Sequence, residues 1–163
     1  MSEPSLESGE SIECAEHCTR KLWVFRLLVF AQFALVATLV LVSQPLQFGW
    51  LAWLVLIAGV AFGVWALLTM GRHVNVSPRL RENVPLQTSG PYRFVRHPMY
   101  LALMVFCGAF LIDSFSFYTG TLWLSLLLVL ACKIYYEEQS LRKRFPDYQA
   151  YCNSTRRIIP FVF

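Results

Sequence analysis

The sequence predicts an all-α, polytopic integral membrane protein with about four transmembrane helices. Of its 163 residues, 56% are hydrophobic and only 15% are charged, whereas an average globular domain has about 25% charged residues. The apolar residues form long blocks: Leu22–Ser43 contains a single charge, Arg26, and Gly49–Met70 contains none. A run of about 20 apolar residues can cross the hydrocarbon core of a bilayer. These observations exclude a soluble enzyme, a nucleic-acid-binding protein and a disordered chain.

The segment before the first apolar block is acidic. Residues 1–19 hold five of the ten acidic residues and no Lys or Arg. Because this segment also has few large apolar residues, we expect it to be a disordered or loosely helical cytoplasmic tail, followed by a membrane domain over residues 20–163. Cys14, His17 and Cys18 lack the four-ligand spacing of a zinc site, so no metal site is predicted.

Four membrane segments are predicted, in the order Leu22–Ser43, Trp50–Met70, Pro98–Ile112 and about Phe117–Tyr136. Basic residues gather between the second and third segments and again after the fourth, and Arg20 and Lys21 precede the first. The positive-inside rule places such basic stretches in the cytoplasm. We therefore expect both termini and the long loop before Pro98 to be cytoplasmic.

The third segment, which begins at Pro98, is short for a full crossing. At 1.5 Å per residue it spans about 22 Å. We expect either a tilted helix in a thinned bilayer or a chain that already lies below the headgroups before Pro98. Non-helical backbone at that depth is tolerated where it lines a polar cavity, so Gly90–His97 is predicted to form a cavity wall. The fourth segment is predicted to continue as a helix up to Pro146.

Two polar and aromatic clusters flank the second pair of membrane segments on the cytoplasmic side. The first, Gly90–Tyr100, contains a turn dipeptide, two arginines and a histidine; the second, Lys133–Leu141, contains Glu137 and Glu138. Taken singly, these residues could be topology determinants, interfacial aromatics or solvated charges. Taken together they predict a pocket for a charged ligand, because carboxylates near the end of a membrane helix are costly to desolvate.

The first cluster carries a family resemblance. Leu86–Tyr100, which includes Arg96-His97-Pro98-Met99-Tyr100, resembles the signature of the isoprenylcysteine carboxyl methyltransferase family, whose superfamily includes phospholipid N-methyltransferases and many bacterial proteins. The second family motif is matched by Glu137-Glu138, Leu141, Phe145-Pro146, Tyr148 and Tyr151. The resemblance covers residues 71–160, more than half of the chain.

The resemblance implies a methyltransferase, like protein-S-isoprenylcysteine O-methyltransferase, that uses S-adenosylmethionine as cofactor. Its pocket would be formed by the 71–98 loop and the C-terminal helix, and an apolar or amphipathic acceptor (a carboxylate, amine or thiol) would arrive through the bilayer. The implied location is a bacterial inner membrane. By position, the implied cofactor contacts are Ser77, Val84, Pro85, Leu86, Gln87, Tyr92, His97, Pro98, Met99, Tyr100 and Glu137. The residues expected to act in catalysis are His97, Lys133 and Arg96.

The chemistry of methyl transfer suggests a role for several of these side chains. Tyr92 and Tyr100 could face the sulfonium through cation–π attraction. Arg93 or Arg96 could pair with the cofactor carboxylate. His97 could order the cofactor or remove a proton from the acceptor.

The two adjacent glutamates are expected to differ. Glu137 would accept hydrogen bonds from the ribose hydroxyls or the amino group of the cofactor, whereas Glu138, rotated by about 100° on the helix, is expected to face solvent or Arg142. Lys133 falls where the family has a substrate-facing arginine. Because lysine lacks the planar fork of arginine, the acceptor need not be a prenylcysteine carboxylate.

The end of the chain leaves two alternatives open. Tyr151-Cys152 and Arg157–Phe163 are similar to the C-terminus of membrane sterol reductases, which use NADPH but need a larger helical bundle. The alternatives are therefore an NADPH-dependent, reductase-like protein and a non-enzymatic membrane partner. Binding of S-adenosylmethionine, of NADPH or of neither distinguishes the three.

Overall fold

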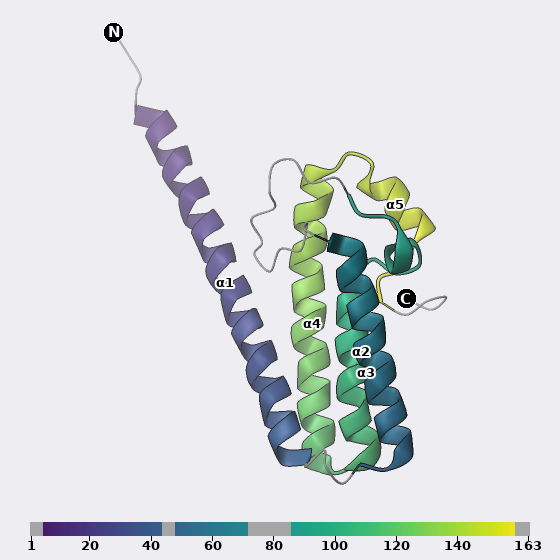
Figure 1. Ribbon diagram of the computed structural model, residues 1–163. Helices are drawn as coiled ribbons and strands as arrows, with labels where there is room; N and C mark the ends of the chain where they lie inside the picture. Colours follow the sequence, from purple (N-terminus) through teal and green to yellow (C-terminus); the bar gives the residue numbers. More distant parts are fainter. Residues whose placement is uncertain (1–4, 44–47, 72–85, 159–163) are drawn as a thin grey trace.

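The computed structural model describes residues 5–43, 48–71 and 86–158, with side chains from Leu22 onward. This part of the chain is built from helices joined by short links (Figure 1). In order, the elements are α1 (Ser5–Ser43), α2 (Trp50–Met70), the 3₁₀ helix η3 (Gly90–Arg93), α3 (Pro98–Asp113), α4 (Phe117–Arg144) and α5 (Tyr148–Ser154). The predicted all-α fold is confirmed, and each of the four predicted membrane segments is helical.

Three of the described helices are long and apolar enough to cross a membrane, over Leu22–Ser43, Trp50–Met70 and Phe117–Arg144. As the sequence predicts, α3 is the short one: its 16 residues span about 24 Å. Large apolar side chains such as Phe30, Leu41 and Leu68 are exposed on the outside of the bundle. Exposed apolar side chains of this size suit a surface that faces lipid. Together with the three candidate spans they identify a polytopic membrane protein.

The acidic N-terminal segment is helical from Ser5, one of the two forms that its composition suggests. The helix begins at Ser5 and continues without a break into the first membrane segment. In Figure 1, α1 lies beside α4 near Ser43 and diverges from the other helices toward its N-terminus. The acidic segment therefore extends the first membrane helix.

Helix α2 packs closely against α3 through small residues. The buried residues of α2 are Ala52, Gly59 and Ala66, which are spaced by two helical turns and share one face. A Cβ at Gly59 would lie 2.7 Å from the backbone nitrogen of Phe106, so only glycine permits this approach. Small residues play the same part in many membrane helix pairs.

The two helical hairpins are joined at one end of the bundle by polar contacts. The backbone N–H of Gly49 donates to Oδ1 of Asp113 at 2.8 Å. Ser116 caps the start of α4 and exchanges hydrogen bonds with Thr119 in a capping box. These contacts hold the short link between α3 and α4 beside the start of α2.

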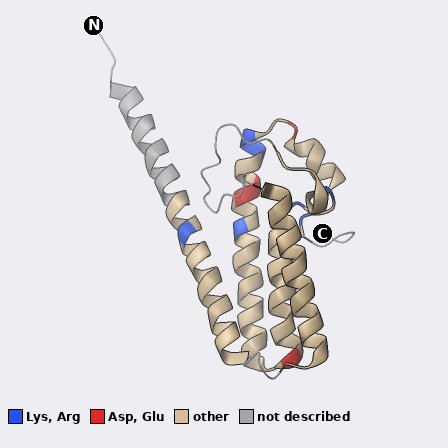
Figure 2. Ribbon diagram, viewed as in Figure 1, with Lys and Arg blue, Asp and Glu red and all other residues tan. Residues whose placement is uncertain are grey.

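At the opposite end, η3 and α5 cover the point at which α3 begins (Figure 1). Val95 and Arg156 form an isolated parallel bridge, and the N–H of Arg96 donates to the carbonyl of Arg156 at 2.7 Å. Figure 2 shows that charged residues gather mainly at this end of the bundle. We call it the polar end; it comprises residues 86–98 and 137–158.

Candidate active site

The two adjacent glutamates of α4 lie in different surroundings at the polar end. The side chain of Glu138 is only 6% exposed, and its carboxylate accepts from Nε of Arg96 at 3.0 Å and pairs with Nε of Arg157 at 3.3 Å. The side chain of Glu137 is 28% exposed and accepts a short hydrogen bond from the hydroxyl of Tyr100. Two arginines therefore balance the negative charge of Glu138, whereas the carboxylate of Glu137 directly contacts Tyr100 and His97.

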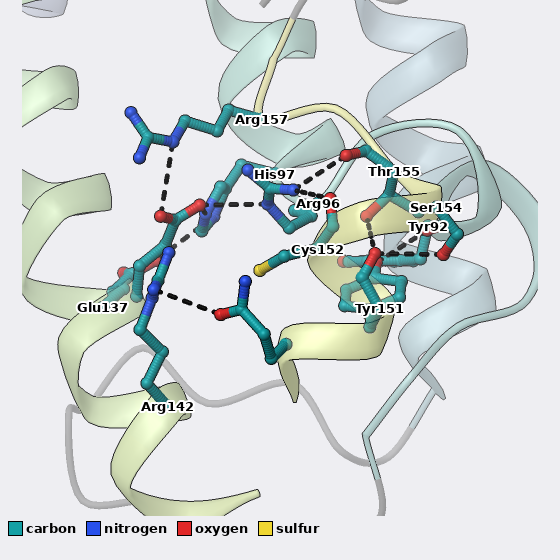
Figure 3. Close-up of polar contacts among 12 residues, drawn as sticks. Tyr92, Arg96, His97, Glu137, Arg142, Tyr151, Cys152, Ser154, Thr155 and Arg157 are labelled. Atoms are coloured by element: carbon teal, nitrogen blue, oxygen red, sulfur yellow. Dashed lines mark hydrogen bonds and ion pairs between the residues drawn. The ribbon is translucent and has the colours of Figure 1, made fainter. Parts of the chain in front are cut away.

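Arg96 connects three parts of the polar end. While Nε of Arg96 donates to Glu138, Nη1 donates to the carbonyls of Cys152 at 3.0 Å and Thr155 at 2.8 Å (Figure 3). These carbonyls lie at the C-terminal end of α5, where a cation is favoured by the helix dipole. Arg96 thus holds α5 against α4, a structural role that its motif position does not reveal. Arg93, the other arginine of this segment, is exposed.

The expectation that Glu138 faces solvent or Arg142 is wrong. Arg142 instead donates to the amide oxygen of Gln149 at 3.3 Å (Figure 3). The rotation of about 100° between neighbouring helical residues does separate the two glutamates, but it turns Glu138 inward, toward Arg96. Of the two carboxylates, Glu138 is the more buried.

His97 lies between the two glutamates. Its Nδ1 is 3.6 Å from Oε2 of Glu137 and its Nε2 is 3.7 Å from Oε1 of Glu138. The ring stacks on Tyr100 with centroids 5.7 Å apart. The imidazole is buried, and Nε2 forms no hydrogen bond among the described residues. Both ring nitrogens therefore face carboxylate oxygens at ion-pair distance.

Tyr92 is buried beneath α5 and held at both ends. Its hydroxyl contacts Sδ of Met70 at 3.8 Å, and its carbonyl accepts from the hydroxyl of Tyr151 at 2.7 Å. Burial, and then the charge of Glu137, raise the pKa of Tyr92 to about 12. Its phenol therefore stays protonated and neutral at physiological pH.

The loop before η3 is fixed on the end of α2. Nε2 of Gln87 donates to the carbonyl of Thr69 at 3.1 Å and to Oγ of Ser89 at 2.7 Å. Gly90 has a positive φ of 58°, and a Cβ there would meet Cγ2 of Thr69 at 2.7 Å. The start of η3 therefore requires glycine.

Lys133 is buried where α1, α3 and α4 meet. Its Nζ donates to Oε1 of Gln32 at 2.6 Å and lies 5.4 Å from the ring centre of Phe25 and 5.0 Å from that of Tyr100. Sequence reasoning located Lys133 but missed its two partners on α1. The available signal was Gln32 itself, a polar residue inside an otherwise apolar block.

The structure brings together most of the sequence-predicted site residues that it describes. His97, Tyr100 and Glu137 are in direct contact, and Tyr92 lies close enough for the charge of Glu137 to affect its pKa. Pro98 is buried at the start of α3, Leu86 and Gln87 are partly buried, and Met99 is exposed. Ser77, Val84 and Pro85 lie outside the described residues. Within the described ranges, no group of three His, Cys, Asp or Glu side chains could hold a metal ion.

Comparison with protein families decides the assignment. The model of the phospholipid methyltransferase family matches residues 48–148, well over half of the chain. The chain belongs to the phospholipid methyltransferase family. This confirms the relationship inferred from the two motifs, and the protein is a membrane methyltransferase. Neither the curated proteins nor the solved structures include a significant match to the chain.

The matched region of this membrane methyltransferase contains both halves of the candidate site. It extends from Phe48, two residues before α2, to Tyr148, the first residue of α5, and it includes the Arg96–Tyr100 motif and the glutamate pair. Helix α1, with Phe25 and Gln32, lies outside it. The family favours methyl transfer over the reductase-like alternative.

Proposed function

We propose that this membrane methyltransferase transfers the methyl group of S-adenosylmethionine to an apolar or amphipathic acceptor at the cytoplasmic face of the membrane. One observation carries the proposal. Glu137, a partly exposed carboxylate, accepts a hydrogen bond from Tyr100 and lies beside the buried His97, in a cluster that also includes Tyr92. A charged site that is partly closed to water is what a small cationic ligand needs.

The residues present fit S-adenosylmethionine. The carboxylate of Glu137 can accept hydrogen bonds from ribose hydroxyls or an ammonium group, and charge-assisted bonds of this kind are strong. The ring of Tyr100 already contacts His97 and the ammonium of Lys133, so the aromatic face that suits a sulfonium cation is that of Tyr92. The high pKa of Tyr92 keeps its ring neutral there.

When bound, S-adenosylmethionine supplies a methyl group already activated on a sulfonium, so transfer mainly requires alignment in a dry site. The chain provides that setting through Tyr92, Tyr100 and the cover of η3 and α5. Nδ1 of His97 lies 3.6 Å from Oε2 of Glu137 and Nε2 lies 3.7 Å from Oε1 of Glu138, so both ring nitrogens face carboxylates and the imidazole is placed to orient Glu137. A carboxylate acceptor requires no proton removal.

We further propose that the polar end faces the cytoplasm, in a bacterial inner membrane. The basic residues of the polar end and of the loop before it support this orientation through the positive-inside rule. Reporter fusions after Pro146 and within Ser114–Ser116 test it. The fusion after Pro146 should report a cytoplasmic location and the other an external one; the reverse pattern would contradict the topology.

The function is tested by methyl transfer from radiolabelled S-adenosylmethionine. Purified protein in neutral bilayers is supplied with a phosphatidylethanolamine or with a farnesylcysteine derivative, which separates an amine acceptor from a carboxylate acceptor. We expect label in one product with the wild type and at least tenfold less with Glu137→Gln. Label in neither product, together with NADPH oxidation, would favour the reductase-like alternative.

A further inference from the structure

Lys133 is a buried cation in the apolar part of the bundle. The side chain is 5% exposed, and Lys133 is the only charged residue of α4 between Phe117 and Tyr136. A lysine ammonium carries three donors, of which Gln32 accepts one. No carboxylate within the described ranges forms a direct ion pair with it, although the charge of Glu137, one turn away on α4, acts on it. A buried ammonium is costly without an anion in direct contact.

The surroundings of Lys133 come from three helices. Phe25 and Gln32, two helical turns apart on one face of α1, contact the ammonium from one side, and Tyr100 of α3 contacts it from the other. Glu137 lies one turn further along α4, but its carboxylate is bonded to Tyr100. Toward its N-terminus α1 diverges from α4 (Figure 1). The cation is therefore held between α1, α3 and α4, and α1 exposes Leu27 and Phe30 between the two residues that contact it.

We propose that Gln32 is a positioning residue of the acceptor site, which orients Lys133 to bind an anionic oxygen on an amphipathic acceptor. The inference rests on the proposed function, because it assumes that the acceptor reaches the site through the bilayer. Gln32 fixes one N–H of the ammonium and directs the other two toward the acceptor. Its amide is neutral, so it holds the cation without cancelling the charge. Helix α1, which the family model does not match, thus contributes to acceptor selectivity.

Gln32→Glu tests this role directly. The substitution keeps the length of the side chain and an oxygen acceptor for Nζ, but its negative charge neutralises Lys133. If Gln32 has a purely structural role, Gln32→Glu should keep or strengthen the contact between α1 and α4 and leave anion binding unchanged. If Gln32 acts in acceptor binding, Gln32→Glu should selectively lose affinity for anions. Lys133→Gln should cause the same loss, and Gln32→Met, which keeps the charge of Lys133, a smaller one.

The probes are dodecyl phosphate, dodecanoate and dodecanol, at low mole fraction in neutral maltoside micelles, with affinity measured by calorimetry. We expect the wild type to prefer both anions to dodecanol, and Gln32→Glu to bind the anions roughly tenfold or more weakly with unchanged dodecanol binding. Loss for dodecyl phosphate alone would indicate a phosphate-bearing acceptor, and loss for dodecanoate alone a carboxylate. Arg26→Gln, which removes the other charge of this region without touching Lys133, is the matched control and should behave as the wild type.

Wild-type affinity for both anions in Gln32→Glu or in Lys133→Gln would overturn the inference. If Gln32→Glu does not fold, Lys133→Gln and Gln32→Met decide it: both must lose anion affinity, and retention in either contradicts it. The binding of S-adenosylmethionine is measured on the same samples and should be unchanged by Gln32→Glu and Gln32→Met. Absence of S-adenosylmethionine binding in the wild type would contradict the proposed function. The preference for anions over dodecanol is measured separately and would still test the role of Gln32 and Lys133.

Discussion

Nε of Arg96 donates to Oε1 of Glu138 at 3.0 Å, and neither side chain is more than 8% exposed. This pair joins α4 to the segment that precedes α3, and Nη1 of Arg96 extends the connection to the end of α5. The site residues on both sides of the pair, His97 and Glu137, are neighbours of these two residues in sequence. The buried pair therefore fixes the two backbone segments that carry His97 and Glu137.

Replacing Glu138 should chiefly reduce stability. Glu138→Gln leaves Arg96 and Arg157 without a carboxylate, and breaking a buried ion pair typically costs about 3–5 kcal/mol. We expect a value near the lower limit, because Arg96 keeps its two carbonyl acceptors. Unfolding in mixed micelles measures the difference. A loss below about 0.5 kcal/mol, as for an ordinary surface substitution, would show that the pair does not stabilise the fold.

Arg96→Lys should loosen the C-terminal segment. A lysine carries the charge but cannot reach Glu138 and the carbonyls of Cys152 and Thr155 with the geometry of a guanidinium. We expect α5 to detach more often and to be cleaved faster by limited proteolysis after Tyr148. Arg93→Lys, at an exposed arginine of the same segment, is the control. Equal cleavage rates for the two variants would contradict the role assigned to Arg96.

Gly90→Ala should destabilise the start of η3. Alanine pays a penalty at positive φ, and its Cβ would approach Thr69 to 2.7 Å; such positions cost about 1–3 kcal/mol. Thr69→Ala should recover part of this loss, because the contacting atoms belong to the threonine side chain. Gly108→Ala, where a Cβ meets nothing within 4 Å, should not lower the unfolding midpoint. If Gly90→Ala is as stable as Gly108→Ala, the backbone requirement is wrong.

The helices could be predicted from sequence because their signals are local. Apolar block length sets α1 and α2, Pro98 marks the first residue of α3, and Pro146 closes the helical stretch of α4, which ends at Arg144. The pattern also predicted that α3 would be too short for a full crossing. These features depend on composition and on single residues with fixed backbone preferences.

The partners of the site residues could not be predicted in the same way. The contact of Lys133 with Gln32 joins residues that are 101 positions apart, and the bonds from Arg96 to α5 span 56 and 59 positions. A motif identifies the residues but not which of two adjacent carboxylates turns inward. That choice depends on how η3 and α5 close over α4, which no local pattern specifies.

Glu137→Gln should weaken cofactor binding with little effect on folding. The substitution removes the negative charge from a partly buried site and replaces one acceptor oxygen with a donor. Losing a charge-assisted hydrogen bond costs about 1.5–3 kcal/mol, or roughly ten- to 150-fold in affinity. The unfolding midpoint should change less than with Glu138→Gln, because no arginine is paired with Glu137 in the described part of the chain.

Calorimetric titration of the purified protein in neutral detergent tests whether Glu137 belongs to a site for S-adenosylmethionine. We expect the wild type to bind S-adenosylmethionine and its demethylated product but not NADPH. We also expect folded Glu137→Gln to bind S-adenosylmethionine at least tenfold more weakly. Binding of NADPH in preference to S-adenosylmethionine, or equal affinity for S-adenosylmethionine in the wild type and Glu137→Gln, would contradict this assignment.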